Sequence, residues 1–330
     1  MTWLLTGGAG YIGAHIVRAL QEIGRPVVVV DDLSGGFIEN VPEGVPFVNA
    51  NILDTDVLEK TMRDHGVVGV IHLAAKKAVG ESVARPLWYY EQNVTAMCHL
   101  LEAMERVDVK RLVFSSSAAT YGDVQVETVT EETATQPTSP YGESKLIGEW
   151  LMKAQSRAVG MSYVSLRYFN VAGSGQPELG DRGVSNLIPL VFRAITAGNS
   201  PEVFGADWPT RDGSCIRDYI HVVDLARAHA AAVEALDRNA ETSGVLGRTY
   251  NIGTGTGTTV LEVVEMAREV TGIDFEPRIV DRRPGDPCRI VADPAAAERD
   301  LGWVATHDLR DMVASAWSSW QHQHQERPGE

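Results

Sequence analysis

The sequence has few cysteines, no long hydrophobic run and no excess of positive charge, and each absence argues against a class of protein. Its three cysteines, Cys98, Cys215 and Cys288, are far apart and lack metal-ligand spacing, so we expect no disulfide framework and no metal site. This cysteine usage favours a reduced, cytoplasmic compartment. The first residues also do not resemble a signal peptide. No apolar run reaches the roughly 18 residues of a membrane span. A net charge of −15 argues against nucleic acid or an anionic membrane as a partner.

With 44% hydrophobic and 22% charged residues, the sequence has the composition of a globular protein. Its 330 residues are enough to form two lobes. Short apolar strands alternate with helices up to residue 172. The expected strands cover residues 2–6, 26–30, 45–48, 69–73, 111–114 and 164–168, and a long helix is expected over 86–106. This alternation predicts an α/β fold, a Rossmann-type doubly wound parallel sheet over residues 1–172.

From residue 173 onward, loops rich in glycine and proline dominate, and this change predicts a smaller mixed α/β C-terminal substrate lobe over residues 173–330. We expect helices over 187–196, 222–236, 260–271 and 308–321, and strands over 216–221 and 248–252. The strand near 248–252 is expected to return to the main sheet. The seam between the lobes is the natural ligand cleft.

A glycine turn follows the first strand, and its spacing predicts a dinucleotide site. Residues 7–13 read Gly-Gly-Ala-Gly-Tyr-Ile-Gly and lead into a helix. Glycines let the backbone approach a pyrophosphate, which the helix N-terminus then holds. Asp31 follows Gly13 by 18 residues, near the distance expected of an acid that binds the adenosine ribose. A carboxylate there repels a 2′-phosphate, so NAD is favoured over NADP.

The stretch from Ser139 to Lys145 predicts a helix start that carries a general base. Ser139 suits the N-cap, Pro140 suits the first helical position, and apolar residues follow at 146, 147, 150 and 151, as on a half-buried helix. Tyr141 and Lys145 are four residues apart and share one helix face. A nearby ammonium and the positive helix end are expected to lower the pKa of the tyrosine. An ordinary, partly exposed Tyr–Lys pair is the alternative.

Taken together, these motifs resemble the extended short-chain dehydrogenase/reductase family, and within it the UDP-glucose 4-epimerase (UDP-galactose 4-epimerase) group. The resemblance runs from Thr2 to about Trp320. Its signatures are Thr6–Gly13, Lys77–Ser82, Ser115–Ala118, Tyr141 with Lys145, Arg167–Asn170, Asn186–Pro189, Arg217–His221 and Arg283–Asp286, the last including Pro284.

The resemblance implies reversible, NAD-dependent epimerisation at C4 of a UDP-hexose through a transient 4-keto sugar, by a homodimer that keeps its NAD bound. It implies a catalytic group of Ser117, Tyr141 and Lys145. It implies an NAD site of Gly7, Gly10, Tyr11, Ile12, Gly13, Asp31, Asp32, Leu33, Ser34, Gly35, Gly36, Asn51, Ile52, Leu73, Ala74, Ala75, Lys77, Asn93, Ser115, Tyr141, Lys145 and Phe169. It implies a UDP-sugar site of Ser117, Asn170, Asn186, Leu187, Phe204, Arg217, Arg283, Asp286 and Ile290.

Several positions depart from the family pattern and leave alternatives open. Asn51 stands where Asp is common near the adenine, and Ala119 replaces a common Thr. Ile290 stands where some members carry Tyr or Cys beside the sugar, so N-acetylhexosamine or pentose substrates remain open. A nucleotide-sugar 4,6-dehydratase would carry an Asp–Glu pair where this chain has Ala118 and Ala119. A non-catalytic NAD-binding protein would tend to lose the Tyr–Lys pair, which is kept here.

Overall fold

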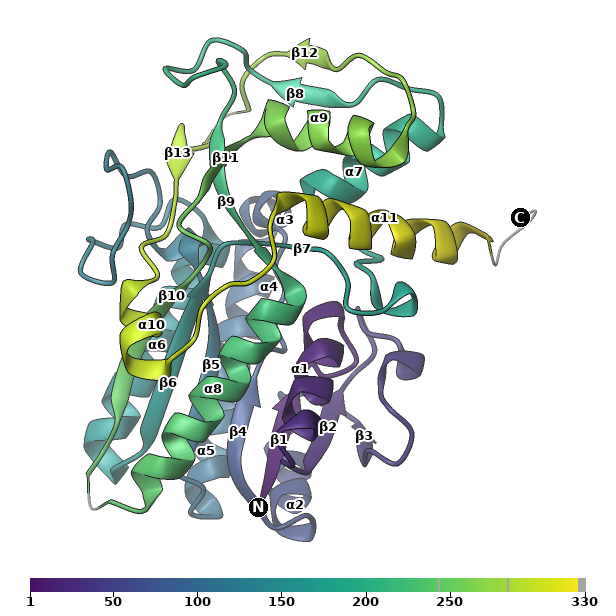
Figure 1. Cartoon of the computed structure of the whole chain (residues 1–330). Helices are drawn as coiled ribbons and strands as arrows, with labels where there is room; N and C mark the ends of the chain where they lie inside the picture. Colours follow the sequence, from purple (N-terminus) through teal and green to yellow (C-terminus); the bar gives the residue numbers. More distant parts are fainter. Residues whose placement is uncertain (243, 284, 326–330) are drawn as a thin grey trace.

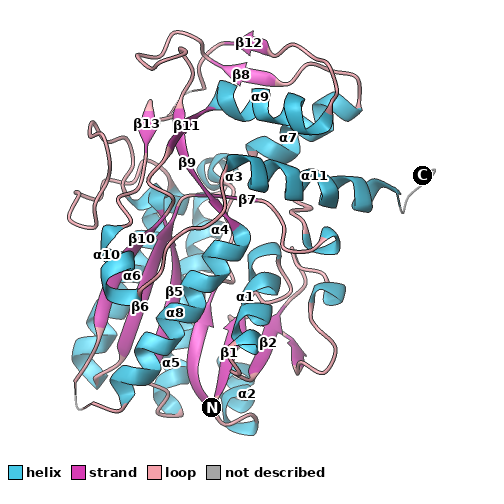
Figure 2. Cartoon of the chain, in the orientation of Figure 1, coloured by secondary structure: helices cyan, strands magenta, loops and turns pink. Residues whose placement is uncertain are grey.

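A seven-stranded parallel sheet forms the centre of the larger lobe (Figures 1 and 2), as expected from the sequence. The computed structural model describes residues 1–242, 244–283 and 285–325. In spatial order the strands are β10 (Gly247–Ile252), β6 (Ser162–Tyr168), β5 (Arg111–Ser117), β4 (Val67–His72), β1 (Thr2–Thr6), β2 (Val27–Asp31) and β3 (Phe47–Asn49). The strand order reverses between β1 and β4, and ligands bind at such a point in doubly wound sheets.

Helices cover both faces of this sheet because its central strands are apolar on both sides. Two consecutive residues of β1 show this, since Trp3 packs into the core on one face and Leu4 into the core on the other. The first core includes α1 (Tyr11–Glu22) and α8 (Val222–Ala240), and the second includes α2 (Thr55–Asp64), α5 (Ala96–Arg106) and α6 (Pro140–Val159). Strands buried on both faces are typical of parallel sheets.

The strand β10 lies at the edge of the main sheet, although it comes late in the chain. It pairs in parallel with β6, from Gly247 opposite Tyr163 to Ile252 opposite Tyr168. The preceding helix α8 covers the same part of the sheet, and α10 (Ala295–Leu301) packs beside both (Figure 1). The larger lobe is therefore built from the N-terminal part of the chain together with two later stretches, one carrying α8 and β10 and the other α10.

The smaller lobe is organised around β9 (Ile216–His221). This strand pairs with β7 (Asn170–Ala172), β11 (Gly257–Thr259) and β13 (Arg289–Ile290). The helices α7 (Leu187–Thr196), α9 (Val260–Thr271) and α11 (Leu309–Gln325) share a third core, and β8 (Glu202–Phe204) pairs with β12 (Arg278–Val280). Pro284 of the Arg283–Asp286 signature lies outside the described residues.

Several boundaries differ from the sequence-based expectation. The strand expected to end at Phe114 continues through the serines to Ser117. The helix expected over 86–106 is split into α4 (Pro86–Tyr90) and α5 by a π-helical turn, η2 (Glu91–Thr95). The closing helix extends to Gln325 rather than 321, and α8 extends to Ala240 rather than 236. The short elements α3 (Val79–Ala84), η1 (Ile38–Asn40), η3 (Ala118–Thr120) and η4 (Pro177–Leu179) complete the fold.

Candidate active site

A cleft of about 1820 Å³ lies where the carboxyl edge of the main sheet meets the smaller lobe. Both lobes contribute to its wall, as expected for the seam between them. The sequence-predicted residues that line it are Tyr11, Ile12, Lys77, Ser117, Tyr141, Phe169, Asn170, Asn186, Leu187, Phe204, Arg217, Arg283, Asp286 and Ile290. All nine predicted UDP-sugar residues are among them. Most of the predicted NAD residues lie in the adjoining turns after β1, β2, β3 and β4 rather than in this wall.

The predicted catalytic group meets at the start of α6. Ser139 caps the helix, since its Oγ accepts the backbone N–H of Gly142 at 3.2 Å. The side chain of Tyr141 is hydrogen-bonded to Ser117, which ends β5. Lys145 is 5% exposed, and its Nζ donates to the carbonyl oxygen of Ser115 at 2.8 Å. The tyrosine and serine therefore lie together in the cleft wall, with the lysine buried behind them.

The expected direction of the tyrosine pKa was wrong for the protein by itself. Burial raises the pKa of Tyr141, and the hydrogen bond with Ser117 lowers it by less. Burial also lowers the pKa of Lys145 to about 8. The Nζ of Lys145 lies 5.9 Å from the centre of the Tyr141 ring and is directed to the backbone of β5, so its charge does not offset the desolvation of the phenol.

The glycine turn has the shape needed to hold a dinucleotide. Gly7 has a φ of +76°, and a Cβ on Gly13 would lie 2.2 Å from the carbonyl oxygen of Gly7, so the turn is closed around residues without side chains. Gly10 is the N-cap of α1 and has no side chain to offer, which leaves the first N–H groups of the helix for an anion. The residues present therefore fit a bound pyrophosphate.

Asp31 ends β2 and holds the glycine turn in place. Its two carboxylate oxygens accept the backbone N–H groups of Ala9 at 3.0 Å and Leu33 at 2.8 Å. Leu33 reaches it from a left-handed backbone conformation with a φ of 57°, which is strained for a leucine. Burial raises the pKa of Asp31, although both N–H groups oppose that rise. A carboxylate thus occupies the position expected to face the ribose.

Both polar atoms of the Asn51 side chain have hydrogen-bond partners, one of which is the carboxylate of Asp32. Its Nδ2 donates to Asp32 at 2.9 Å, and its Oδ1 accepts the N–H of Leu53 at 2.9 Å. Partial burial raises the pKa of Asp32, but hydrogen bonds from Ser34 and other contacts outweigh it, so that the net pKa is lowered. The amide that departs from the family pattern therefore keeps a defined orientation at the end of β3.

The π-helical turn places Asn93 between two parts of the cofactor region. Its side chain accepts the N–H of Lys76 at 2.8 Å and donates to the carbonyl of Lys76 and to Ser144 Oγ, each at 3.0 Å. Lys76 in turn donates from Nζ to Ser34 at 2.8 Å. The family resemblance implied that Asn93 and the range Leu73 to Lys77 belong to the NAD site, and the contact with Ser34 is what distinguishes Lys76 from its neighbour Lys77.

The substrate side of the cleft contains two arginines with one nearby carboxylate. Arg217 is 13% exposed at its side chain, and its Nη2 lies 3.8 Å from Asp286 Oδ1. The guanidinium of Arg283 stacks on the ring of Phe204 at 4.1 Å from the centre. Two guanidinium groups can bind the oxygens of a diphosphate, and an exposed aromatic ring can support a planar base.

Ile290 both faces the cleft and packs into a buried cluster. It lines the cleft, and it also packs against the buried cluster that includes Phe169, Tyr121 and Ala292. Ile290 pairs directly with Arg217 across the parallel strands β13 and β9. The side chain is therefore part of the same wall as the arginine.

The loop that follows β7 is tied to both lobes next to the cleft. The hydroxyl of Tyr11 donates to the carbonyl of Gly173 at 2.5 Å, and Gly175 N–H donates to His15 Nε2 at 2.9 Å. Ser174 N–H donates to Ser315 Oγ of α11 at 3.1 Å. The cofactor helix α1 and the closing helix α11 thus hold one short segment between them.

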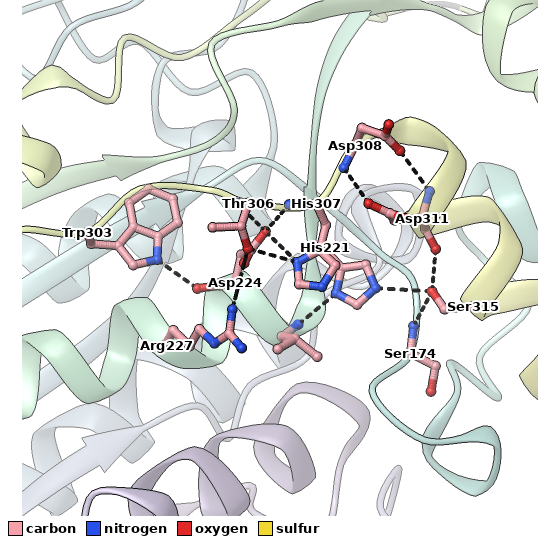
Figure 3. A network of polar contacts seen from close by, with 11 residues as sticks. Ser174, His221, Asp224, Arg227, Trp303, Thr306, His307, Asp308, Asp311 and Ser315 are labelled. Atoms are coloured by element: carbon pink, nitrogen blue, oxygen red, sulfur yellow. Dashed lines mark hydrogen bonds and ion pairs between the residues drawn. The ribbon is translucent and has the colours of Figure 1, made fainter.

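A polar network continues from this loop to α8 (Figure 3). His221 Nε2 lies 3.1 Å from Ser315 Oγ, and its ring stacks on His307 with centroids 4.2 Å apart. His307 Nδ1 lies 3.0 Å from a carboxylate oxygen of the fully buried Asp224. Burial lowers the pKa of His221 to about 4, so it stays neutral at physiological pH. The network fixes the end of β9, the strand that carries Arg217.

Comparisons with known proteins agree with this geometry. A family model described as the NAD dependent epimerase/dehydratase family matches residues 3–253. The chain belongs to this family.

Individual relatives in the family are similar over nearly the whole chain. A UDP-glucose 4-epimerase of Corynebacterium glutamicum is 42% identical over 96% of this chain and 95% of its own length. A crystal structure of the enzyme of the same name from Stenotrophomonas maltophila, with bound NAD and formylated UDP-arabinopyranose, has a TM-score of 0.93 at 39% identity and covers 99% of this chain and all of its own. A UDP-Glc/GlcNAc 4-epimerase of Campylobacter jejuni has a TM-score of 0.84 at 33% identity and covers 98% of this chain and 99% of its own.

Two further findings concern the described residues, 1–242, 244–283 and 285–325. They contain no helix that is long and apolar enough to cross a membrane. Within the same residues, no group of three or more His, Cys, Asp and Glu side chains could hold a metal ion. The three cysteines are free thiols.

Proposed function

We propose that this chain is a UDP-glucose 4-epimerase that reversibly inverts C4 of UDP-glucose and UDP-galactose through a 4-keto sugar, with NAD as its cofactor. The observation that carries the proposal is that Tyr141 and Ser117 lie in one cleft wall between the glycine turn and the two arginines of the smaller lobe. A sugar whose diphosphate reaches Arg217 and Arg283 would lie across this wall. Residues 1–172 together with β10 would then bind mainly NAD, and the rest mainly the UDP-sugar.

The residues of the chain account for the proton transfer. Tyr141 takes the proton of the sugar 4-OH, and Ser117 donates to the same sugar oxygen and orients it. Bound NAD would supply the hydride acceptor and donor at C4, which the side chains of the protein do not provide. Because burial raises the pKa of Tyr141, its ionisation needs additional positive charge next to the phenol. Lys145 Nζ lies 5.9 Å from the centre of the Tyr141 ring, and its bond to the Ser115 carbonyl fixes it behind the reacting group.

Inversion requires a firmly held diphosphate and a sugar that can turn. Arg217 and Arg283 suit the first need because guanidinium groups bind phosphate oxygens in pairs. Asp286 lies near Arg217 and would hold its fork in place until phosphate arrives. The sugar itself would face the apolar side chains Phe169 and Ile290, which offer few hydrogen bonds and allow rotation.

Two alternatives are open to the same experiment. A 4,6-dehydratase would need carboxylates after the active-site hydroxyl, but Ala118 and Ala119 form η3 there. A non-catalytic NAD-binding protein would not convert any sugar. We would supply UDP-galactose without added NAD and identify the products. UDP-glucose supports the proposal, a 6-deoxy-4-keto sugar indicates a dehydratase, and no conversion by NAD-loaded protein refutes catalysis of this reaction.

We also infer that the enzyme works as a homodimer in the cytoplasm. Val83, Leu87 and Trp150 are large apolar side chains with exposed fractions of 63%, 82% and 57%, and they lie on α3, α4 and α6, which pack against one another. Such exposed groups favour a partner surface. The free thiols suit a reducing compartment. Sedimentation of the Leu87→Glu and Trp150→Glu variants would test the dimer, since a charge at its interface should produce monomers.

A further inference from the structure

Glu149 is a buried carboxylate that the proposed mechanism does not use. It lies on α6 one turn after Lys145 and is 1% exposed. Its two oxygens accept Arg167 Nε at 2.8 Å and Nη2 at 2.6 Å, a bidentate pair with a guanidinium that is itself 4% exposed. Burying both charges of an ion pair gives little net stability, because desolvation offsets the attraction. A contribution to stability therefore does not explain why this pair is buried here.

The position at which Glu149 contacts the sheet suggests a role in placing α6. Three residues spaced by four along α6 contact three successive serines of β5. Tyr141 bonds to Ser117 and Lys145 bonds to the carbonyl of Ser115, while Glu149 Oε1 accepts the hydroxyl of Ser116 at 2.6 Å. Two of these contacts belong to the proposed catalytic group. The third contact, made by the Glu149 carboxylate, lies at the same strand end but has no part in the proposed proton transfer.

Arg167 extends the contact to the neighbouring strands. It lies on β6, and its Nη1 donates to the Tyr121 hydroxyl at 3.1 Å. Tyr121 donates to Asn251 of β10 at 2.6 Å, and Asn251 Nδ2 donates to the carbonyl of Val129 at 3.0 Å. The polar chain thus connects α6 with β5, β6 and β10 beneath the cleft wall. A slide of α6 along β5 would break several of these bonds at once.

We propose that Glu149 and Arg167 are positioning residues that hold α6 in one register on β5, and so keep the Tyr141 oxygen beside Ser117 at the reacting carbon. The proposal rests on the proposed function, because it assigns these residues to the epimerisation step. Misplacement of a reacting group by about 1 Å can cost about 10²-fold in rate without changing how the rest of the substrate binds. Loss of the pair should therefore lower kcat and leave KM nearly unchanged.

The chain offers a matched control in a second ion pair at the opposite end of β5. Asp237 of α8 accepts Arg111 at 2.7 Å and Arg25 at 2.8 Å, and its side chain is 8% exposed. Arg111 begins the strand that Ser117 ends. Asp237→Asn and Glu149→Gln each remove one buried carboxylate charge next to β5, from helices on opposite faces of the sheet. They differ in distance from the cleft.

The test compares four proteins: the unchanged enzyme, Glu149→Gln, the double variant Glu149→Met with Arg167→Met, and Asp237→Asn. We would measure kcat and KM for UDP-galactose, the bound cofactor, and the thermal midpoint. Glu149→Gln should lose about 10- to 100-fold in kcat, with KM within about threefold. The double variant should regain the thermal midpoint, because methionines replace an ion pair without a lone charge, yet kcat should stay low. Asp237→Asn should lower the midpoint only.

Two outcomes would overturn the positioning role. One is an equal loss of kcat in Glu149→Gln and Asp237→Asn, and the other is recovery of both kcat and midpoint in the double variant. A chain that converts no UDP-sugar would instead refute the proposed function, and hydrogen exchange then tests the register by itself. Backbone amides of 141–149 should exchange faster in Glu149→Gln than in Asp237→Asn, and equal rates would reject the proposal.

Discussion

Two glycines of the same turn should respond differently to the same added methyl group. The sequence motif treats Gly10 and Gly13 alike, but the structure surrounds them differently. A Cβ on Gly13 would lie 2.2 Å from Gly7 O and 2.7 Å from Gly8 Cα, whereas a Cβ on Gly10 would meet only Gly7 O at 3.4 Å. Gly13→Ala should therefore damage the fold of the turn, and Gly10→Ala should affect mainly what binds beside it.

The magnitude for Gly13→Ala follows from the distances. The contact atoms are backbone, and ordinary contact begins at 3.4 Å, so the turn must move by about 1 Å. Overpacking of this kind costs at most about 3 kcal/mol. The variant also gains about 1 kcal/mol, because alanine is the better helix former inside α1. The net loss is about 2 kcal/mol, which lowers the thermal midpoint by about 3 °C, because unfolding a chain of 330 residues at about 2.1 cal/mol/K per residue has an entropy of about 0.7 kcal/mol/K.

Gly10→Ala should have the opposite profile. Gly10 has φ −76° and ψ 171°, an extended conformation that alanine adopts freely, and the loss of a glycine N-cap costs only about 0.5–1 kcal/mol. Its methyl group would point into the space at the helix N-terminus where a pyrophosphate is expected. The affinity for NAD should then fall by at least about tenfold, or about 1.4 kcal/mol.

Thermal unfolding and calorimetric NAD titration of cofactor-free protein would measure both effects. The two variants should separate, with Gly13→Ala losing stability without any ligand and Gly10→Ala losing affinity at nearly unchanged stability. If Gly13→Ala has the same thermal midpoint as the original protein, the close approach of residue 13 to the backbone of Gly7 and Gly8 does not limit the stability of the protein. If Gly10→Ala binds NAD normally, the pyrophosphate does not lie at this helix end.

Three further predictions follow from the cleft and the core. Tyr141→Phe keeps the ring but removes the proton acceptor, so kcat should fall by at least about 10²-fold while bound NAD is retained; near-normal turnover would assign the base elsewhere. Ile290→Tyr should suppress turnover of N-acetylated UDP-hexoses more than that of UDP-galactose, since overpacking penalises the larger sugar first, and equal losses would remove Ile290 from the sugar wall. Burial lowers the pKa of His72 to about 3 and that of His229 to about 4. The unfolded chain therefore binds protons at these histidines at a higher pH than the folded chain, and the free energy of unfolding should fall as the pH drops from about 6.5 to 4. Urea midpoints measured across this range should fall less steeply with decreasing pH in His229→Gln than in the original protein.

Elements with complete local signals could be predicted from the sequence. The expected helices over 187–196 and 260–271 have the observed bounds of α7 and α9. In α9, Thr259 and Glu262 form a capping box, in which each side chain bonds the other residue's backbone N–H. A signal of this kind lies within a few residues and needs no tertiary partner to be effective.

The burial of α6 could not be predicted in the same way. The apolar pattern placed Trp150 on the half-buried face, but Trp150 is 57% exposed, whereas Lys145 and Glu149 are buried. The reason is the partner of the helix, a strand end whose serines accept and donate hydrogen bonds. Apolar periodicity cannot reveal such a surface, although the spacing of Tyr141, Lys145 and Glu149 by four residues was visible in the sequence.

The pKa of Tyr141 was mispredicted for a related reason. The helix start and Lys145 are local features, and both favour the phenolate. Burial depends on the tertiary packing around the tyrosine, and in the structure it is the larger effect. The contact of Arg167 with Glu149 was likewise hidden, because it joins residues of a strand and a helix that no local pattern relates.

The late arrival of β10 has a consequence for how the chain folds as it is synthesised. Until residue 252 has been made, β6 has hydrogen-bond partners only on its β5 side, and its other edge remains open. Sheet edges of this kind pair readily with other chains. The helix α8, which covers this part of the sheet, is made directly after β9 of the smaller lobe. A nascent chain that stalled after residue 172 would therefore present β6 with one open edge, and residues 173–246, which include part of the smaller lobe, must emerge before β10 closes that edge.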